Sequence, residues 1–402
     1  MAANRIKSPK SPLRTESLPN LRQTGYTSRM DNPFRPTFGA PPLFWVGRGI
    51  VLDNFRTALD GSAGNASRSM VLSGARGIGK TVLINELEDI AEARGWVTLR
   101  ASGRSTMVEE LVNTTIPRLL ERLSPSDKKK VSRIGIGGVG SIGFDHQKED
   151  RFTPTLNTRL RELSAELKGT GILLTIDEVQ DADVEELTTI AVAYQDLVRD
   201  EIDIALVAAG LPQGVNHLLD LPGVTFLRRA QKFVLGPLSP VNAEQALEHT
   251  ASGSGLEFSH EAITDAAALT RGYPYLVQLV GSLAWERSRR NHESGISQQT
   301  IASIAPDAIS IMGAQVHQPA TLALPPAQRE FLEAMAAVEV DGIATIADIA
   351  GHMDRTVRSL SATRQRLIDA DLIEPTAHGK LRYVIPYMGE YFTTTDSRGR
   401  VD

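Results

Sequence analysis

The feature that most constrains the fold is an eight-residue segment, GARGIGKT at 74–81. It has the pattern G-x-x-x-x-G-K-[ST], in which the backbone N–H groups of a glycine-rich turn converge on a phosphate at the N-terminus of a helix. The apolar run SMVLSG (69–74) precedes the segment, and TVLINELEDIAEA continues it as a helix. The segment therefore predicts a strand, a phosphate-binding loop and a helix, in that order.

The positions of this loop suggest a nucleotide and a metal as its ligands. We expect Lys80 to reach the β- and γ-phosphates of ATP, and the Thr81 hydroxyl to ligate Mg²⁺. The residues expected to contact the nucleotide are Gly74, Ala75, Arg76, Gly77, Ile78, Gly79, Lys80, Thr81 and Val82. ATP and magnesium are the predicted cofactors.

A second segment, ILLTIDE (172–178), ends in two acids. Alone, it could be any buried strand whose end faces solvent. Paired with the phosphate-binding loop, it predicts that Asp177 holds the magnesium shell and that Glu178 polarises the attacking water as the general base. Arg228 and Arg229 precede the last predicted core strand, where they could supply a cation to a neighbouring subunit's site; the alternative is a solvated pair or a local salt bridge.

Apolar strand-like runs alternate with helical segments, which is typical of an α/β fold with a parallel sheet. The predicted strands are 69–74, 96–101, 171–177, 203–210 and 232–236. We expect a disordered basic tail at 1–38, a core at 39–237 with a glycine-rich hairpin inserted at 124–150, a helical lid at 238–305, a linker at 306–325, a C-terminal domain at 326–395 and a tail at 396–402.

The composition restricts the classes of function. A chain of 402 residues can hold two or three domains, and its net charge of −5 argues against a uniformly basic nucleic-acid coat. The absence of cysteine excludes disulfides and thiol chemistry. No run of about 18 apolar residues is present, so we expect no membrane association and a cytoplasmic location.

Two parts of the chain carry local basic clusters. The N-terminal tail is either simply solvated or an arm that touches nucleic acid or a partner. The predicted hairpin contains Lys128, Lys129, Lys130 and Arg133, so it is either a surface decoration or a loop that contacts DNA or a partner.

The C-terminal pattern resembles a winged helix-turn-helix: a helix, a short strand near Ala344, two further helices, and two strands around a turn at 378–380. In that architecture the long helix enters the DNA major groove and the wing contacts the backbone. We expect Leu360, Leu367 and Ile368 to face the core. The predicted DNA-binding residues are Arg355, Arg358 and Arg364 on the long helix and Lys380 on the wing, with Arg366 and Arg382 adding charge. Docking of a protein is the alternative.

Taken together, residues 42–395 resemble the AAA+ superfamily, and within it the origin-recognition-like ATPases and the GxP-bearing signal-transduction ATPases. The resemblance implies a P-loop AAA+ core, a small helical lid and a C-terminal winged helix. It also implies that Val46, Gly47, Arg48 and Pro274 lie near the nucleotide.

Two departures from the family pattern point to a slow, ATP-gated switch. The strand that normally ends in a polar sensor residue ends here in Ala209 and Gly210. In the lid, GYP at 272–274 stands where many members carry a sensing arginine; Tyr275 takes its place, with Arg271 close by.

Three functions are compatible with these features. The first is an ATPase that couples ATP state to binding of double-stranded DNA, with assembly into a homo-oligomer. The second is a signalling switch whose winged helix and hairpin dock protein partners. The third, an ATPase helper of transposition or plasmid maintenance, shares the mechanism of the first.

Overall fold

The structure is a computed structural model that describes residues 31–37, 39–103, 106–123, 154–167 and 169–396. The glycine-rich hairpin predicted at 124–150 and most of the predicted N-terminal tail lie outside these residues.

The core is built on one sheet of five parallel strands. They are β1 (Ser69–Gly74), β2 (Val97–Ser102), β3 (Ile172–Asp177), β4 (Ile204–Gly210) and β5 (Gln231–Leu235). The predicted strands match these bounds to within one residue at each end, which confirms the predicted α/β class. The strand order is β2-β3-β4-β1-β5.

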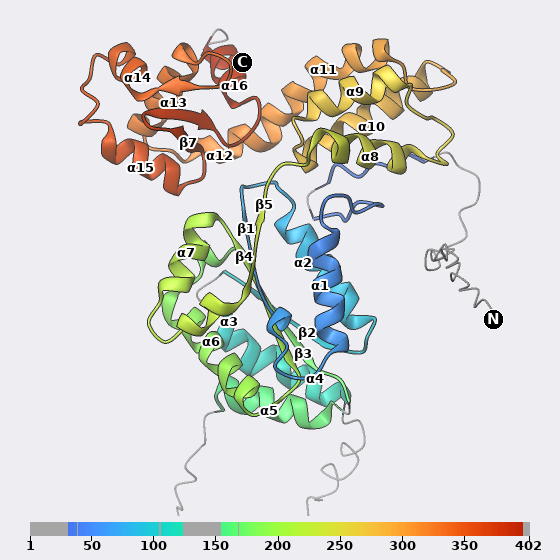
Figure 1. Cartoon of the computed structure of the whole chain (residues 1–402), viewed down its shortest axis with the longest axis vertical. Helices are drawn as coiled ribbons and strands as arrows, with labels where there is room; N and C mark the ends of the chain where they lie inside the picture. The colour runs from blue at the N-terminus through green and yellow to red at the C-terminus, as the bar shows by residue number, and fades with distance from the viewer. Residues whose placement is uncertain (1–30, 38, 104–105, 124–153, 168, 397–402) are drawn as a thin grey trace, which may run out of the picture. The chain divides into compact units, whose positions relative to one another are not determined.

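Helices cover both faces of this sheet (Figure 1). Along β4, Ala205 and Val207 lie in one apolar cluster, whereas Leu206 and Ala208 lie in the other, because successive side chains of a strand point to opposite faces. The first cluster is covered by α1 (Gly49–Asp60) and α2 (Lys80–Glu92). The second is covered by α3 (Met107–Glu110), the π-helical turn η2 (Leu111–Thr115), α4 (Ile116–Leu123), α5 (Leu156–Glu166), α6 (Val184–Arg199) and α7 (Pro212–Asp220).

The strand order brings the ends of separate segments together. Strand β4 pairs with β1 on one side and with β3 on the other, so the loop after β1 and the acids after β3 emerge at the same edge of the sheet. In this register Ser73 lies beside Gly210. Ligands of open parallel sheets bind at such carboxyl edges. Short 3-10 turns complete the core: η1 (Ala66–Arg68), η3 (Val179–Asp181) and η4 (Thr225–Arg229).

After the core, the chain forms a helical lid of α8 (Pro240–Ala251), α9 (His260–Thr270), α10 (Pro274–Arg290) and α11 (Gln298–Met312). Serine side chains cap α8, α9 and α11 at their N-termini. Part of the segment predicted as a disordered tail packs against these lid helices. Phe34 is buried in the apolar cluster of the lid, and the Asn32 amide donates to the Ser282 hydroxyl at 2.8 Å. The segment from Asn32 to Phe34 is therefore packed against the lid helices and is not part of a disordered tail.

The segment predicted as a linker, 306–325, is helical for most of its length. Helix α11 passes through Pro306, a π-helical turn η5 (Gly313–His317) follows, and α12 (Gln318–Leu322) completes the run. Met312 is buried and His317 is fully enclosed. The apolar side of this segment packs into the core of the molecule, so it remains ordered despite its proline and glutamine content.

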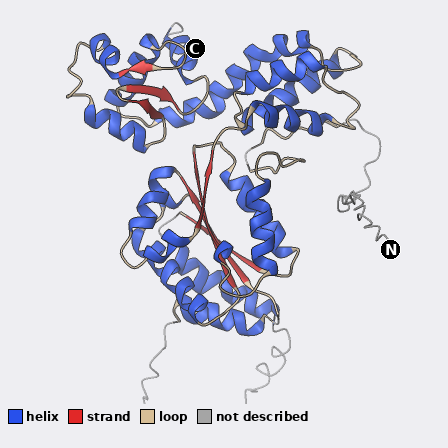
Figure 2. Cartoon of the chain, viewed as in Figure 1, coloured by secondary structure: helices blue, strands red, loops and turns tan. Residues whose placement is uncertain are grey.

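The C-terminal domain contains helices and a small antiparallel sheet (Figure 2). Its elements are α13 (Pro326–Val338), β6 (Ala344–Thr345), α14 (Ile346–His352), α15 (Ser361–Asp369), β7 (Ile373–Ala377), β8 (Lys380–Tyr383) and α16 (Met388–Asp396). The sheet order is β6-β8-β7. Leu360 and Leu367 are buried as predicted, and Ile368 packs partly against the same cluster.

The long helix predicted for this domain is shorter in the structure. Helix α15 begins at Ser361, so Arg355 and Arg358 lie before it rather than on it. The Thr356 hydroxyl accepts the Ser359 N–H at 3.3 Å, and the Ser361 hydroxyl donates to the Arg358 carbonyl at 2.8 Å. Local bonds of this kind from serine and threonine compete with helical hydrogen bonds, which explains the turns at 354–360.

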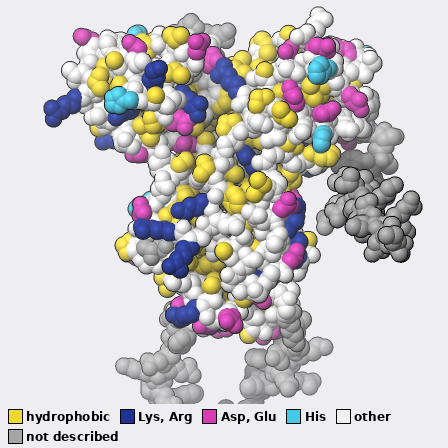
Figure 3. Space-filling view, in the orientation of Figure 1, with side chains coloured by type: hydrophobic (Ala, Val, Ile, Leu, Met, Phe, Trp, Pro, Cys, Tyr) yellow, Lys and Arg dark blue, Asp and Glu magenta, His cyan; other side chains and the backbone are white. Residues whose placement is uncertain are grey.

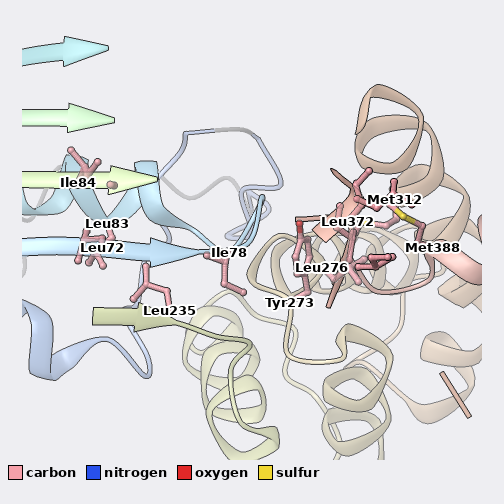
Figure 4. Close-up of a cluster of buried hydrophobic side chains, with 14 of the residues drawn as sticks. Leu72, Ile78, Leu83, Ile84, Leu235, Tyr273, Leu276, Met312, Leu372 and Met388 are labelled. Carbon is pink, nitrogen blue, oxygen red and sulfur yellow. The ribbon is translucent and has the colours of Figure 1, made fainter. Parts of the chain in front are cut away.

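A continuous apolar cluster links the sheet to the lid and the C-terminal domain. Figure 4 shows Leu72 and Ile78 at the core end of this cluster, Tyr273 and Leu276 from the lid, and Leu372 from the C-terminal domain. The phosphate-binding loop is therefore packed against parts of the chain that lie far away in sequence. Among the described residues, no helix has the length and apolar character needed to span a bilayer.

Candidate functional site

The loop between β1 and α2 has the conformation expected of a phosphate cradle. Gly77 and Gly79 have φ angles of 72° and 92°, in the left-handed region that favours glycine. Lys80 is the first residue of α2, and its ammonium donates to the Gly74 carbonyl at 2.8 Å and to the Ala75 carbonyl at 2.9 Å. Burial lowers the pKa of Lys80, while the nearby carboxylates, Asp371 first among them, act to raise it.

The two sequence motifs meet at the sheet edge. The Thr81 hydroxyl donates to Oδ2 of Asp177 at 2.6 Å, although the two residues are 96 positions apart. Glu178 follows with a left-handed φ of 55°. Burial raises the pKa of Glu178, and the hydrogen bond shared with Asp181 and the charge of Asp177 act in the same direction. A carboxyl group with a raised pKa is suited to accept a proton near neutral pH.

The donor set at this edge fits a magnesium ion. Thr81 and Asp177 supply two hard oxygen ligands side by side. Mg²⁺ in phosphate-handling sites is commonly held by one or two protein groups, with phosphate oxygens and water completing the octahedron. Among the described residues, no group of three or more His, Asp or Glu side chains is arranged to hold a metal by itself.

A cavity of about 820 Å³ extends from this loop toward the lid. Most of the predicted nucleotide contacts line it, namely Val46, Arg48, Arg76, Gly77, Ile78, Gly79, Lys80, Thr81, Val82 and Pro274. Gly47 lies between two of these lining residues, and Gly74 and Ala75 contribute the carbonyls that hold Lys80. The structure thus brings this predicted set together around one cavity, which is large enough for a nucleotide.

Tyr273 is a lid residue whose contact with the loop the sequence analysis did not identify. Its hydroxyl donates to the Arg76 carbonyl at 2.5 Å, and a Cβ placed on Gly77 would meet that hydroxyl oxygen at 1.9 Å. Burial raises the pKa of Tyr273 well above its usual value, so it stays a neutral donor. Tyr273 directly precedes Pro274, which the sequence predicts near the nucleotide. This adjacency is the signal that could have identified Tyr273 as a site residue.

Asp371, from the C-terminal domain, was also missed. Only 7% of this residue is exposed, and it lies close to Lys80 and to the backbone N–H of Arg76 in the phosphate-binding loop. Burial raises the pKa of Asp371 to about 6, while Lys80 and the loop N–H act to lower it. No signal in the sequence indicated this contact, since Asp371 lies in another domain.

The predicted arginine pair does not reach this cavity within the chain. Arg228 donates to the Leu219 carbonyl at 2.9 Å and pairs with Asp220 at 2.9 Å, and neither arginine lines the cavity. Both side chains are exposed on η4. Within the chain Arg228 thus forms a local salt bridge, and its role toward a neighbouring subunit's site stays a prediction.

The lid residues considered for a sensing role differ in their contacts. Tyr275 lines the cavity, and its hydroxyl donates to Gln315 at 2.6 Å. Arg271 pairs with Glu390 at 2.7 Å, and its guanidinium lies 3.8 Å from the ring centroid of Tyr387. Arg271 is thus bound to the C-terminal domain instead of facing the cavity.

The predicted DNA-binding residues are spread over the surface of the C-terminal domain. Arg358 and Lys380 are exposed, whereas Arg364 is half-buried. Arg355 pairs with Glu330 at 3.5 Å, and Arg382 pairs with Glu374 at 2.5 Å. On the face of the C-terminal domain drawn in Figure 3, Lys and Arg side chains are separated from one another by Asp, Glu and uncharged side chains.

Comparisons with known proteins agree with this geometry. Residues 45–206 match the family described as AAA ATPase domain, and residues 314–392 match a domain of unknown function (DUF8462). No curated protein matches the chain significantly.

Two solved structures share the fold over most of the chain. The first is the Walker-type ATPase PABY2304 of Pyrococcus abyssi, at 16% identity and a TM-score of 0.56, covering 87% of this chain and 96% of that one. The second is the ORC2 protein of Aeropyrum pernix in its ADPNP–ADP complexes, at 16% identity and a TM-score of 0.55, covering 90% and 97%.

The fold is therefore a P-loop AAA+ core, a parallel sheet with helical regions around it. The family matched by residues 45–206, the AAA ATPase domain, is a class of domain that binds a nucleotide together with a divalent metal.

Proposed function

We propose that this chain binds ATP with Mg²⁺, hydrolyses it slowly, and couples the nucleotide state to the binding of double-stranded DNA through a C-terminal winged helix. The observation that carries the proposal is the meeting of two motifs: Thr81 of the phosphate-binding loop donates to Asp177, beside Glu178 and the buried Lys80. The nucleotides in the ORC2 structure of Aeropyrum pernix add support, since that protein has the same fold.

In this proposal each residue has a defined task. The ammonium of Lys80 leaves its two carbonyl partners to contact the β- and γ-phosphates. When bound, magnesium neutralises the charge that develops between these phosphates. Glu178 takes the proton of the attacking water as the water oxygen bonds to the γ-phosphorus and the bond to the β–γ bridging oxygen breaks.

Slow turnover is proposed because several groups that accelerate AAA+ hydrolysis have other contacts or are missing. Strand β4 ends in Ala209 and Gly210, which offer no polar side chain. Arg271 is paired with Glu390, and Arg228 with Asp220. Arg229 is exposed, and assembly with another copy of the chain would allow it to act on a neighbour's nucleotide.

The DNA role rests on the C-terminal domain. The order of its elements, with α14 and α15 followed by the strand pair β7 and β8, supports the winged helix in this proposal. Arg358 and Lys380 are exposed, on the turns before α15 and on the strand pair. Exposed cations of this kind contact phosphates without reading the sequence.

Protein docking is the second candidate for this domain. Arg355 and Arg382 are paired with acids of their own domain, which lowers the positive charge available to a phosphate backbone. A signalling switch would use the same domain against a protein surface. The two candidates differ in the salt dependence of binding to DNA.

The test of nucleotide binding compares two lysines. Lys80→Ala should raise the dissociation constant for MgATP by about 10- to 150-fold, because a charge-assisted contact to phosphate contributes about 1.5–3 kcal/mol. Lys232→Ala, which removes an exposed lysine of β5, should leave it unchanged. Isothermal titration calorimetry on the full chain measures both. Equal affinities for wild type and Lys80→Ala would contradict the nucleotide site.

A further inference from the structure

The end of β4 has no polar side chain of its own, yet a polar group lies there. Ala209 and Gly210 end the strand beside β1, where Gly210 is paired with Ser73, the residue before the phosphate-binding loop. Gln180, from the turn η3 that follows the two acids, extends to this position and lines the cavity together with Glu178 and Leu211.

The hydrogen bonds of Gln180 fix the orientation of its amide. Its Oε1 accepts the backbone N–H of Leu211 at 3.0 Å. Its Nε2 donates to Glu178 at 3.4 Å and to Asp181 at 3.2 Å. A backbone N–H requires an acceptor and a carboxylate requires a donor, so only this orientation of the amide satisfies all three partners.

Two glycines leave the space that Gln180 occupies. A Cβ on Gly210 would meet Oε1 of Gln180 at 2.8 Å and the Val179 side chain at 2.5 Å. A Cβ on Gly214 would meet Cβ of Gln180 at 2.4 Å. Any larger residue at the end of β4 would therefore displace the turn that carries Gln180. The small residue at the end of β4 therefore leaves room for the amide of Gln180, which a larger residue at that position would displace.

We infer that Gln180 replaces the missing polar residue of β4 as the positioning residue for hydrolysis: its amide holds the Glu178 carboxylate in place by linking it to the backbone at Leu211. This inference rests on the proposed ATPase function. Gln180 acts through Glu178, so its loss lowers the rate of the chemical step and leaves the affinity for ATP intact.

The decisive variant is Gln180→Glu, which keeps the length of the side chain and the acceptor for the Leu211 N–H but removes the donor to Glu178. We expect a kcat at least about tenfold below wild type, with a much smaller change in the dissociation constant for MgATP. Gln299→Glu adds the same charge on an exposed lid position and should behave as wild type.

Gln180→Ala is a second test variant, because it removes the amide without adding a charge. Its kcat should fall by a similar factor, without a change in ATP affinity. Unchanged kcat in a folded Gln180→Glu or Gln180→Ala protein would overturn the inference while leaving the ATPase proposal in place. A wild-type protein with no turnover would overturn both.

Discussion

The carboxyl edge of the core sheet and the surface of the C-terminal domain both carry cations, but they hold them differently. Lys80 is buried and anchored by two carbonyls, with three carboxylates acting on it. Arg358 and Lys380 lie in solvent. At the carboxyl edge of the sheet each side chain is held by specific partners, so a single substitution tests one role. On the open surface, charges act in sum, and their contribution depends on salt.

The largest expected effect is on ATP turnover, from a substitution at the carboxyl edge of the sheet. Glu178→Gln should reduce ATP turnover by about a hundredfold or more, because a general base contributes about 10²–10⁴ to the rate. The dissociation constant for MgATP should stay within about twofold of wild type. Phosphate release under saturating ATP, together with calorimetric titration, measures the two quantities.

Glu185→Gln is the matched control for this variant, since Glu185 is an exposed glutamate in the first turn of α6. It should hydrolyse ATP at the wild-type rate. If Glu178→Gln were equally active, the general base would have to be another group.

An intermediate effect, on the free energy of unfolding, is expected from Asp371, the residue of the C-terminal domain that lies close to Lys80 and Arg76. Burial raises the pKa of Asp371 from its ordinary 3.8 to about 6. Below pH 3.8 the carboxyl is protonated in both the folded and the unfolded chain. As the pH rises through 6, the folded state must hold a buried carboxylate, and its stability falls by up to about 3 kcal/mol relative to a neutral side chain.

Asp371→Asn should therefore become progressively more stable than wild type between pH 4 and pH 7. Urea denaturation at a series of pH values measures the difference in the free energy of unfolding. Asp369→Asn, an exposed aspartate at the end of α15, should show no such trend. A difference that stays constant with pH would show that Asp371 is not buried as a charged group.

The smallest effect is expected on the open surface. Changing Arg358 and Arg364 together to alanine should weaken binding to duplex DNA by about tenfold at low salt and reduce the slope of log affinity against log salt by about 2. Arg199→Ala with Arg290→Ala removes the same charge from α6 and α10 and should have no such effect.

Fluorescence anisotropy with a labelled duplex, at several salt concentrations, measures both quantities. If the wild-type chain does not bind DNA at low salt, with or without ATP, the DNA role is wrong and protein docking is the candidate that remains for this domain.

The same contrast explains what the sequence could predict. The five strands follow from apolar runs, because buried parallel strands are apolar on both faces. The phosphate-binding loop follows from a motif whose spacing is set by phosphate geometry, and the acids at 177–178 follow from a second apolar run read together with that loop. Their contact, Thr81 with Asp177, could be expected because both segments end at the same edge of one sheet.

Contacts between domains could not be predicted in this way. Tyr273 reaches the Arg76 carbonyl across 197 positions, and Asp371 comes from beyond the lid. No local pattern encodes such pairs. The turns at 354–360 were missed for another reason: hydroxyl groups of Thr356, Ser359 and Ser361 satisfy the backbone there, and helix propensity alone does not register that competition.

Helix α7 has contacts at its start that extend beyond the core. The N–H of Leu211, just before the helix, is held by Gln180, and two residues later Gln213 donates to the Ile368 carbonyl of the C-terminal domain at 2.8 Å. These two attachments are separated by about 3 Å of helical rise. A tilt of this first turn would therefore move both attachments together. A shift beside Glu178 would then reach Ile368, near the C-terminal end of α15, without passing through a flexible loop.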